Sequence, residues 1–186
     1  MSRLEDTLRR IVKVLGKVGL NYAVIGAFAV ATYGRPRATV DVDVAVAVSD
    51  DGKLRELTKT LRRSEFELPN PNPNIKNRMF AFTDSRRAVE GEIWLHPDGI
   101  EWDAETIRRC RKSRFGLGRA HFEVYILSPE DLIVNKLARS DRSEQDERDV
   151  ISILQNLSKE LDNSYLETRA TRAGVKEVLQ AIRSTL

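Results

Sequence analysis

Residues 40–48 read VDVDVAVAV, and this alternating stretch predicts a β-strand at the centre of a sheet. Successive side chains of a strand point to opposite faces, so the five valines at every second position share one face. Valine is also among the residues that strands favour. The opposite face carries Asp41, Asp43, Ala45 and Ala47. Two carboxylates on an otherwise apolar strand require an explanation, because a buried charge without a partner is costly.

Helix and strand patterns follow one another irregularly on both sides of this strand. Ser2 and Glu5 form a capping-box pattern at the start of an amphipathic helix that ends near Gly16 and Gly19. Further strands are predicted at residues 22–25, 79–83, 89–95 and 121–127, and further helices at residues 27–31, 51–63 and from Asp103 onward. The order lacks the regular alternation of a βαβ protein. We therefore expect an α/β (α+β) fold, in which a small mixed sheet is flanked by helices.

The last third of the sequence is helical in pattern. Ser128 and Pro129 form a strong helix start, with a capping serine before a proline at the first helical position. Helices are predicted at residues 132–138, 143–161 and from about residue 163 to the end. We expect two domains: residues 1–127 contain the sheet, and residues 128–186 form a helical subdomain packed on it.

Composition excludes several functional classes. The 186 residues contain 31 Lys and Arg against 28 Asp and Glu, a net charge of +3 that permits contact with a polyanion without demanding it. A single cysteine, Cys110, precludes an internal disulfide and argues against a zinc site, and only two histidines argue against a hydrolase triad. No apolar run approaches the ~18 residues of a membrane span, and the first ten residues lack the apolar region of a secretory signal. We expect a soluble cytoplasmic protein whose chemistry depends on carboxylates, lysine and arginine.

The aspartate pair could hold metal ions. A strand rises about 3.3 Å per residue, so Asp41 and Asp43 are expected to have Cα atoms roughly 7 Å apart and to point the same way. Such carboxylates can converge on one or two hard cations. The alternative is that both face solvent on a sheet that is covered on one side only.

A phosphate-binding turn could lie next to this pair. Gly26 and Ala27 stand between a predicted strand and a predicted helix, where backbone amides can hold phosphate oxygens. Arg35 and Arg37 add two cations close to where a polyphosphate would lie. Taken alone, Gly26 has a simpler explanation, because glycine is common at strand–helix turns for steric reasons.

The stretch from Ile25 to Asp43 combines a Gly-Ala turn, a helix, a Gly-Arg-Pro-Arg-Ala-Thr segment and an Asp-x-Asp strand. This combination resembles the DNA polymerase β-like nucleotidyltransferase superfamily, and in particular its minimal prokaryotic branch, which includes the AbiEii-type toxins of toxin–antitoxin systems. Glu92 matches the family's third carboxylate on a neighbouring strand, and Glu90 shares its face. The remaining elements of the family pattern correspond to residues 128–132, Lys136, and Asp146 to Asp149.

The resemblance implies a metal-dependent enzyme that transfers NMP from an NTP to an acceptor. The catalytic residues, and the ligands of two Mg²⁺ ions or of Mn²⁺, would be Asp41, Asp43 and Glu92. The nucleotide would contact Gly26, Ala27, Arg35, Arg37, Lys136 and Asp149. Lys136 would neutralise the β- and γ-phosphates, or else be a lysine on a helix surface. Two residues depart from the family pattern: Ala27 lacks a hydroxyl for the phosphates, and Glu92 is one methylene longer than the usual aspartate.

The sequence does not determine which acceptor receives the NMP group or which partners the protein binds. An RNA end such as that of tRNA, a protein hydroxyl or a small molecule would each suit the chemistry, and a toxin would have a cognate antitoxin. A basic cluster suits an RNA acceptor or is simply a solvated face; its members are Arg108, Arg109, Arg111, Lys112, Arg114 and Arg119. Asp146 and Asp149 would orient Lys136 or an arginine, or complement a helix dipole. We find no DNA-readout motif and expect no membrane partner. The alternative to an enzyme is an inactive module of the same fold that binds nucleotide, RNA or a protein.

Overall fold

The computed structural model describes residues 2–116 and 121–186, which fall into two compact units. The sheet unit contains the described residues of Met1–Gly26, Ala38–His96 and Arg111–Ile126. The helical unit contains Ala27–Arg37, Pro97–Cys110 and Leu127–Leu186. Two segments from the first 127 residues group with the helical unit, and the division into domains at residues 127/128 stays a prediction.

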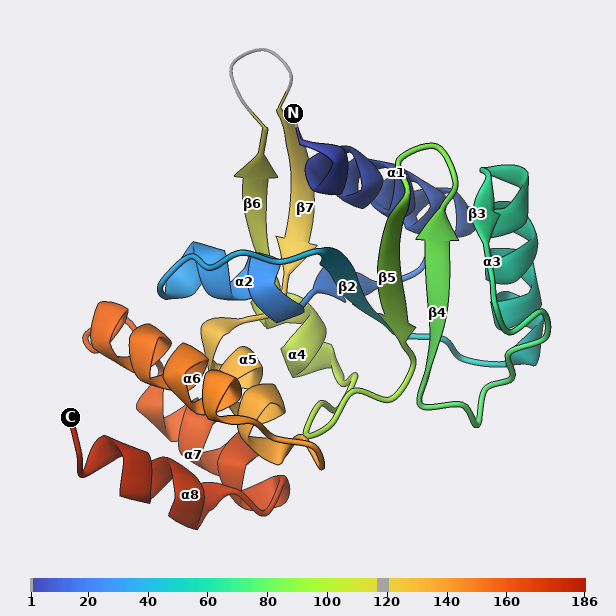
Figure 1. Ribbon diagram of the computed structural model, residues 1–186. Helices are drawn as coiled ribbons and strands as arrows, with labels where there is room; N and C mark the ends of the chain where they lie inside the picture. Colours follow the sequence, from blue (N-terminus) through green and yellow to red (C-terminus); the bar gives the residue numbers. More distant parts are fainter. Residues whose placement is uncertain (1, 117–120) are drawn as a thin grey trace. The chain divides into compact units, whose positions relative to one another are not determined.

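The sheet unit is built on a mixed sheet that, within the described residues, has seven strands in the order β3-β4-β5-β2-β1-β7-β6 (Figure 1). Its strands are β1 (Tyr22–Val24), β2 (Asp41–Val46), β3 (Phe66–Glu67), β4 (Met79–Asp84), β5 (Val89–Trp94), β6 (Arg111–Phe115) and β7 (Phe122–Ile126). The central strand β2 runs parallel to β5 and antiparallel to β1, and β1 runs parallel to β7. The helices α1 (Arg3–Val18) and α3 (Asp51–Arg63) complete this unit. The mixed α/β fold expected from the sequence is confirmed.

One face of β2 is part of the core, as the valine pattern predicts. Val42, Val44 and Val46 are fully buried, and the apolar side of α1 is buried in the same unit. The strand is shorter than predicted, because pairing with β5 begins at Asp41 and leaves Val40 outside the ladder, 84% exposed. The predicted capping box of Ser2 and Glu5 is present at the start of α1. At the start of α3, Asp50 accepts a hydrogen bond from the Lys53 amide.

Two strands were not predicted. Residues 111–115 read as a run of charges, yet they form β6, an edge strand that pairs antiparallel with β7. The strand β3 is only two residues long and pairs with β4. Both depend on a neighbouring strand for their hydrogen bonds, and an edge strand with charged side chains lacks the apolar alternation that marks a buried strand.

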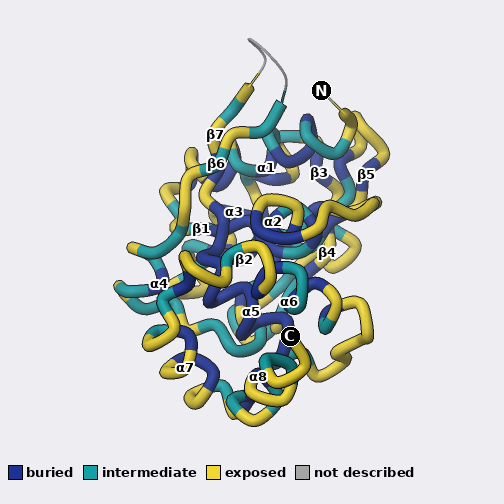
Figure 2. Tube along the Cα trace, turned by 90° about the vertical axis from the view of Figure 1, so that its left-hand side faces the viewer, coloured by how far each residue is buried: buried dark blue, intermediate teal, exposed yellow. Residues whose placement is uncertain are grey.

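The helical unit contains α2 (Gly26–Tyr33, from Ala27 onward), α4 (Ala104–Arg109), α5 (Pro129–Ala138), α6 (Glu144–Asn156), α7 (Asn163–Arg172) and α8 (Lys176–Arg183). The helix α5 is buried along nearly its whole length (Figure 2) and packs against α6 and α7. Its predicted cap is present, because the Ser128 hydroxyl accepts a hydrogen bond from the Asp131 amide. Among the described residues, no helix is both long and apolar enough to cross a membrane.

The stretch predicted to be helical from about residue 163 to the end contains two helices, α7 and α8. The chain breaks at Gly174, which has φ +69°, a conformation that glycine adopts at little cost. The Val175 amide donates to the Ala170 carbonyl and closes the end of α7. A glycine inside a helical pattern is tolerated often enough that the sequence alone did not reveal the break.

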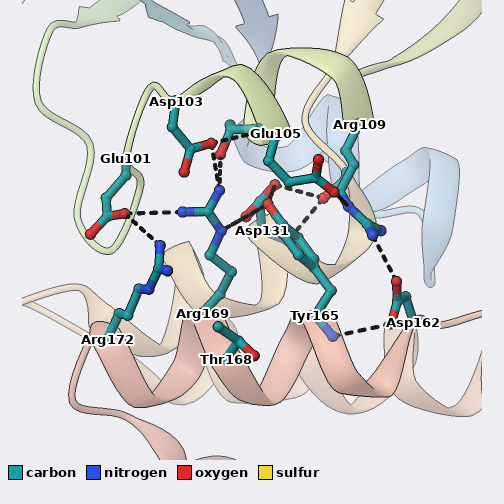
Figure 3. A network of polar contacts seen from close by, with 12 residues as sticks. Glu101, Asp103, Glu105, Arg109, Asp131, Asp162, Tyr165, Thr168, Arg169 and Arg172 are labelled. Atoms are coloured by element: carbon teal, nitrogen blue, oxygen red, sulfur yellow. Dashed lines mark hydrogen bonds and ion pairs between the residues drawn. The ribbon is translucent and has the colours of Figure 1, made fainter.

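A buried arginine joins α7 to the start of α4 (Figure 3). Arg169 is 3% exposed, and its guanidinium donates to Asp103 Oδ1 at 2.6 Å, Thr106 Oγ1 at 2.8 Å and the Tyr165 hydroxyl at 2.9 Å. The hydrogen bond from Arg169 lowers the pKa of Asp103 to about 2, and burial raises the pKa of Tyr165 to about 12. The ionised Asp103 therefore stabilises the unit above its usual pKa of 3.8, and this contribution is lost as the pH falls toward 2.

Replacing Gly91 by alanine should destabilise the protein by roughly 1–3 kcal/mol, the cost of overpacking a core. A Cβ on Gly91 would overlap the Val42 carbonyl oxygen and come within 2.8 Å of the Phe82 ring atom Cε1. The same change at Gly16 of α1, where nothing lies within 4 Å, should raise stability by up to about 1 kcal/mol. Urea unfolding of both variants checks this, and equal stability of the two would contradict the packing described for β5.

Candidate functional site

Four carboxylates share one face of the sheet unit. The parallel register of β2 and β5 pairs Asp41 with Glu90 and Asp43 with Glu92. Paired residues on adjacent strands point to the same side, here opposite the buried valines, and neighbouring strands are about 4.8 Å apart. Asp43 and Glu92 are partly buried, whereas Asp41 and Glu90 are exposed. The structure thus brings the three predicted catalytic carboxylates onto two adjacent strands.

Neighbouring side chains hold two of these carboxylates. The Thr39 hydroxyl donates a hydrogen bond to Asp41 Oδ1. The indole Nε1 of Trp94 donates to Glu92 Oε2 at 3.0 Å. The sequence analysis missed Trp94, although its place two residues after Glu92 on the same strand puts both side chains on one face.

The predicted phosphate-binding turn at Gly26 lies directly against Asp43 of β2. Gly26 has φ +63°, and a Cβ there would overlap Asp43 Oδ2 and lie 2.9 Å from Asp43 Cγ. The Ile25 amide donates to the Asp43 carbonyl at 3.1 Å, which fixes the start of this turn against β2. Gly26 is therefore needed both for its backbone conformation and for the space beside the Asp43 carboxylate. Ala27 follows it as a buried residue of α2.

The donor atoms on this face suit a hard divalent cation. Asp41, Asp43 and Glu92 offer only carboxylate oxygens, the ligands that Mg²⁺ prefers. In residues 2–116 and 121–186, no three His, Cys, Asp or Glu side chains are gathered closely enough to hold a metal ion. The face fits such an ion in donor chemistry, and Asp41 and Asp43 are the residues that would hold it.

The helical unit contains a buried cation with two carboxylate partners. Lys136 is 3% exposed, and its Nζ lies 2.8 Å from Asp146 Oδ1 and 3.0 Å from Asp149 Oδ2. Burial alone would raise the pKa of Asp146, but hydrogen bonds from Lys136 and Ser143 hold it below its usual range. The predicted contact of these aspartates with Lys136 is present, and Lys136 is a buried residue of α5, not one on the helix surface. Its role toward a nucleotide stays a prediction.

The two predicted arginines lie in the same unit. Arg37 Nε is 3.3 Å from Asp149 Oδ1, so one carboxylate serves both Arg37 and Lys136. The backbone amide of Arg35 donates to Ser152 Oγ on α6 at 3.1 Å. Both arginines line a hollow beside α6.

The predicted basic cluster falls into two parts. Arg108 and Arg109 belong to α4 and form ion pairs with Glu105, and Arg109 also pairs with Asp162. Three members lie on the edge strand β6, and they are Arg111, Lys112 and Arg114. Arg119 lies outside the described residues.

The remaining candidates for covalent chemistry are not poised for it. Cys110 is half-buried, and burial raises its pKa to about 11, so its thiol stays protonated near neutral pH. His96 is exposed and contacts the Ile75 carbonyl through Nε2 at 2.6 Å. The chemistry that the described residues support is that of the carboxylate face.

Comparison with solved structures identifies the architecture. A nucleotidyltransferase-like protein from Paracoccidioides brasiliensis aligns over 95% of this chain and 90% of its own, with a TM-score of 0.54 and 21% identity. The chain has the nucleotidyltransferase fold. The structure of ANT(2″)-Ia in complex with adenylyl-2″-tobramycin aligns over 92% of this chain and 97% of its own, with a TM-score of 0.57 and 12% identity. The lincomycin-bound lincosamide antibiotic adenylyltransferase LnuA aligns over 83% and 96%, with a TM-score of 0.50 and 13% identity.

A family model agrees with this fold over part of the sequence. Residues 109–184 match the family described as "Nucleotidyltransferase of unknown function (DUF6036)". No curated protein matches the chain. The matched segment includes Lys136 and Asp149 but not the carboxylate face on β2 and β5.

Replacing Lys136 by methionine should lower the free energy of unfolding by about 3–5 kcal/mol, because two buried carboxylates lose their shared cation. Lys59 of α3 is exposed, and Lys59→Met should change stability by less than about 0.5 kcal/mol. Denaturant unfolding measures both. A Lys136→Met protein as stable as wild type would contradict the structural part of this assignment. A loss of nucleotide binding in a Lys136 variant should therefore be interpreted only after its stability has been measured.

Proposed function

We propose that the protein is a metal-dependent nucleotidyltransferase that moves NMP from an NTP to an acceptor hydroxyl and releases pyrophosphate. The observation that carries the proposal is the register of β2 and β5, which pairs Asp43 with Glu92, while the Asp43 carboxylate lies directly against Gly26. Nucleotidyl transfer depends mainly on charge neutralisation and in-line positioning, which carboxylates on a rigid sheet are suited to provide.

Each carboxylate has a distinct role in this proposal. Asp41 and Asp43 would hold Mg²⁺, which when bound would neutralise charge on the triphosphate; Mn²⁺ is the alternative ion. Glu92 accepts the proton of the acceptor hydroxyl. The acceptor oxygen then forms a bond to the α-phosphorus while the bond to the β-phosphate bridging oxygen breaks, and pyrophosphate leaves with that electron pair. Trp94 positions Glu92 through the indole hydrogen bond.

The nucleotide contacts also remain proposals. The backbone amides of Gly26 and Ala27 would face phosphate oxygens. In the helical unit, Arg35, Arg37 and Lys136 supply positive charge, and Asp149 positions both Arg37 and Lys136 through its carboxylate. A toxin role with a cognate antitoxin rests on the sequence resemblance alone.

A single-stranded RNA is the acceptor that we propose, because the strand register puts basic side chains of β6 on the same face of the sheet as Asp43. Val44 pairs with Val24, Val24 with Ile126, and Ile126 with Arg111, so these four side chains lie on the same face of the sheet. Their neighbours in the strands alternate to the other side. The residues of β6 on the face of Asp43 are therefore Lys112 and Arg114, three strand spacings or roughly 14 Å from β2.

An aromatic side chain accompanies these cations. Tyr125 of β7 is 41% exposed, and Lys112 Nζ lies 5.6 Å from the centre of its ring. Arg114 Nε is 3.5 Å from Glu123, an exposed pair that contributes little. Exposed cations next to an aromatic ring suit a phosphate backbone with unstacked bases. A small molecule, such as the antibiotics of the two adenylyltransferase structures, or a protein hydroxyl is the competing acceptor.

Glu92→Gln should reduce transfer by roughly 10²–10⁴-fold, the usual loss for a general base, while NTP binding changes only a few-fold. Asp43→Asn should reduce both transfer and Mg²⁺-dependent NTP binding. The assay follows labelled NTPs into total RNA, lysate protein and aminoglycosides, with calorimetry for binding. Glu90→Gln is the matched control on the same strand face and should retain activity. A wild-type protein that labels no acceptor from any of the four NTPs would favour the inactive binding module.

If RNA is the acceptor, Lys112→Gln/Arg114→Gln should reduce RNA labelling and weaken its dependence on salt, because fewer counterions are displaced. The control Lys59→Gln/Arg63→Gln removes the same charge from exposed positions of α3. Labelling of RNA at several salt concentrations compares the two. Equal loss in both double variants would assign the effect to net charge and not to β6.

A further inference from the structure

The strand β6 leaves one edge of the sheet open. It is the last strand of the sheet, so within the described residues only one of its sides is paired, and the partner is β7 (Figure 1). Hydrogen-bonded positions alternate along an antiparallel pair, so roughly half of the five residues of β6 direct their amide and carbonyl groups away from β7. Such an open row of backbone groups is a template to which another extended chain can add.

The open edge is accessible within the sheet unit. No residue of β6 is buried, and β7 is the only described element of this unit that packs extensively against it. Among the described residues, no hydrogen bond from outside the ladder of β6 and β7 reaches the backbone of Lys112, Ser113 or Arg114. An added strand would therefore displace water from these groups and not another part of the sheet unit.

The opposite edge of the sheet offers a much shorter row of backbone groups. Its strand β3 is two residues long, and one of them, Phe66, is buried. The chain then reaches Pro69, which has no amide hydrogen to donate. By contrast, β6 pairs regularly with β7 over all five of its residues and contains no proline. Strand addition is therefore favoured at β6 and disfavoured at β3.

The charges on β6 determine which kind of chain can add. Lys112 contacts the ring of Tyr125, and in the part of the chain that the structure describes no carboxylate lies within ion-pair distance of its ammonium group. Arg114 has one exposed partner, Glu123. Lys112 and Arg114 are two residues apart and share one face of the sheet. Acidic side chains at every second position of an added strand would lie about 5 Å from them, which is the distance of a cross-strand pair.

The same features argue against two other occupants. If β6 paired with β6 of a second copy, cations would lie opposite cations, and like charges in that position destabilise a sheet. A nucleic acid strand could neutralise the side chains, but it has no row of amides and carbonyls to pair with the open backbone. An acidic polypeptide in an extended conformation satisfies both the side chains and the backbone of β6.

We infer that β6 is the docking edge for an acidic, extended segment of another protein, which adds to the sheet as a further strand. Backbone hydrogen bonds to β6 would supply most of the affinity, and carboxylates beside Lys112 and Arg114 would select the partner. This binding needs neither the carboxylate face nor a nucleotide or a metal ion. The inference therefore goes beyond the proposed function and does not depend on it.

The test is an NMR titration of the full chain with a short, end-blocked peptide in which Glu and Thr alternate, since threonine favours strands. The amide signals of Lys112, Ser113 and Arg114 should shift, and those of α3 should not. Two matched peptides are N-methylated, one at every Glu and the other at every Thr. In an added strand only alternate amides face β6. Methylation of that set should weaken binding by about tenfold or more, because several hydrogen bonds are lost, whereas methylation of the other set should change it little.

Variants of the protein test the choice of partner. Lys112→Gln/Arg114→Gln should weaken binding of the unmethylated peptide by roughly two- to fivefold for each charge lost, the contribution of an exposed ion pair. The control Lys59→Gln/Arg63→Gln should bind it as wild type does. The inference is overturned if wild type does not bind the peptide, if the shifted signals lie outside β6 and β7, or if the control loses as much affinity. It is also overturned if both methylated peptides bind as well as the parent, because β6 would then recognise charge alone, as it would in RNA.

Discussion

The parallel pairing of β2 with β5 is the constraint on which the sheet unit depends. It places Gly91 beside Val42 on the buried face, where Phe82 occupies the space that a side chain would need. The same pairing puts Asp43 next to Glu92 on the other face. Because side chains alternate with a period of two, a slip by one residue would move the valines out of the core and the carboxylates into it. Folding and the candidate chemistry therefore require the same register.

Buried ion pairs and hydrogen bonds connect the helices of the helical unit to one another. Lys136 of α5 joins two aspartates of α6, and Arg169 of α7 joins Asp103 and Thr106 at the start of α4. Removing charges from water is costly, so each cation is surrounded by several acceptors. Hydrogen bonds of fixed direction also limit how these helices can slide against one another, which apolar packing alone would permit. This explains why a unit of short helices can hold side chains in defined positions.

Much of the fold was predictable because its signals are local. The valine alternation of β2 and the caps at Ser2, Asp50 and Ser128 each depend on a few adjacent residues, and the structure contains all of them. The edge strand β6 was not predictable in this way, because its hydrogen bonds come from β7. The break at Gly174 was not predictable either, because the residues on both sides of it have a helical pattern.

The candidate site was predictable to a similar extent. Asp41, Asp43 and Glu92 could be selected from spacing and resemblance, and their common face follows from strand geometry. The partners of these residues could not, since the indole of Trp94 and the carboxylates around Lys136 are defined by side-chain directions and by packing. The hollow beside α6 combines residues more than 100 positions apart in the sequence, and no local pattern reveals such a combination.

The interleaving of the two units has a consequence for how the chain can be divided. The polypeptide passes between the units five times, at residues 26/27, 37/38, 96/97, 110/111 and 126/127. No single cut therefore separates one complete unit from the other. A fragment ending at residue 127 would retain Arg35, Arg37 and α4 but lose α6 and α7, to which they are joined. A protease nick or a premature stop codon in the last third of the chain would thus leave exposed surface in a fragment that still contains every strand of the described residues. We expect such fragments to be degraded and not to accumulate as a smaller stable protein.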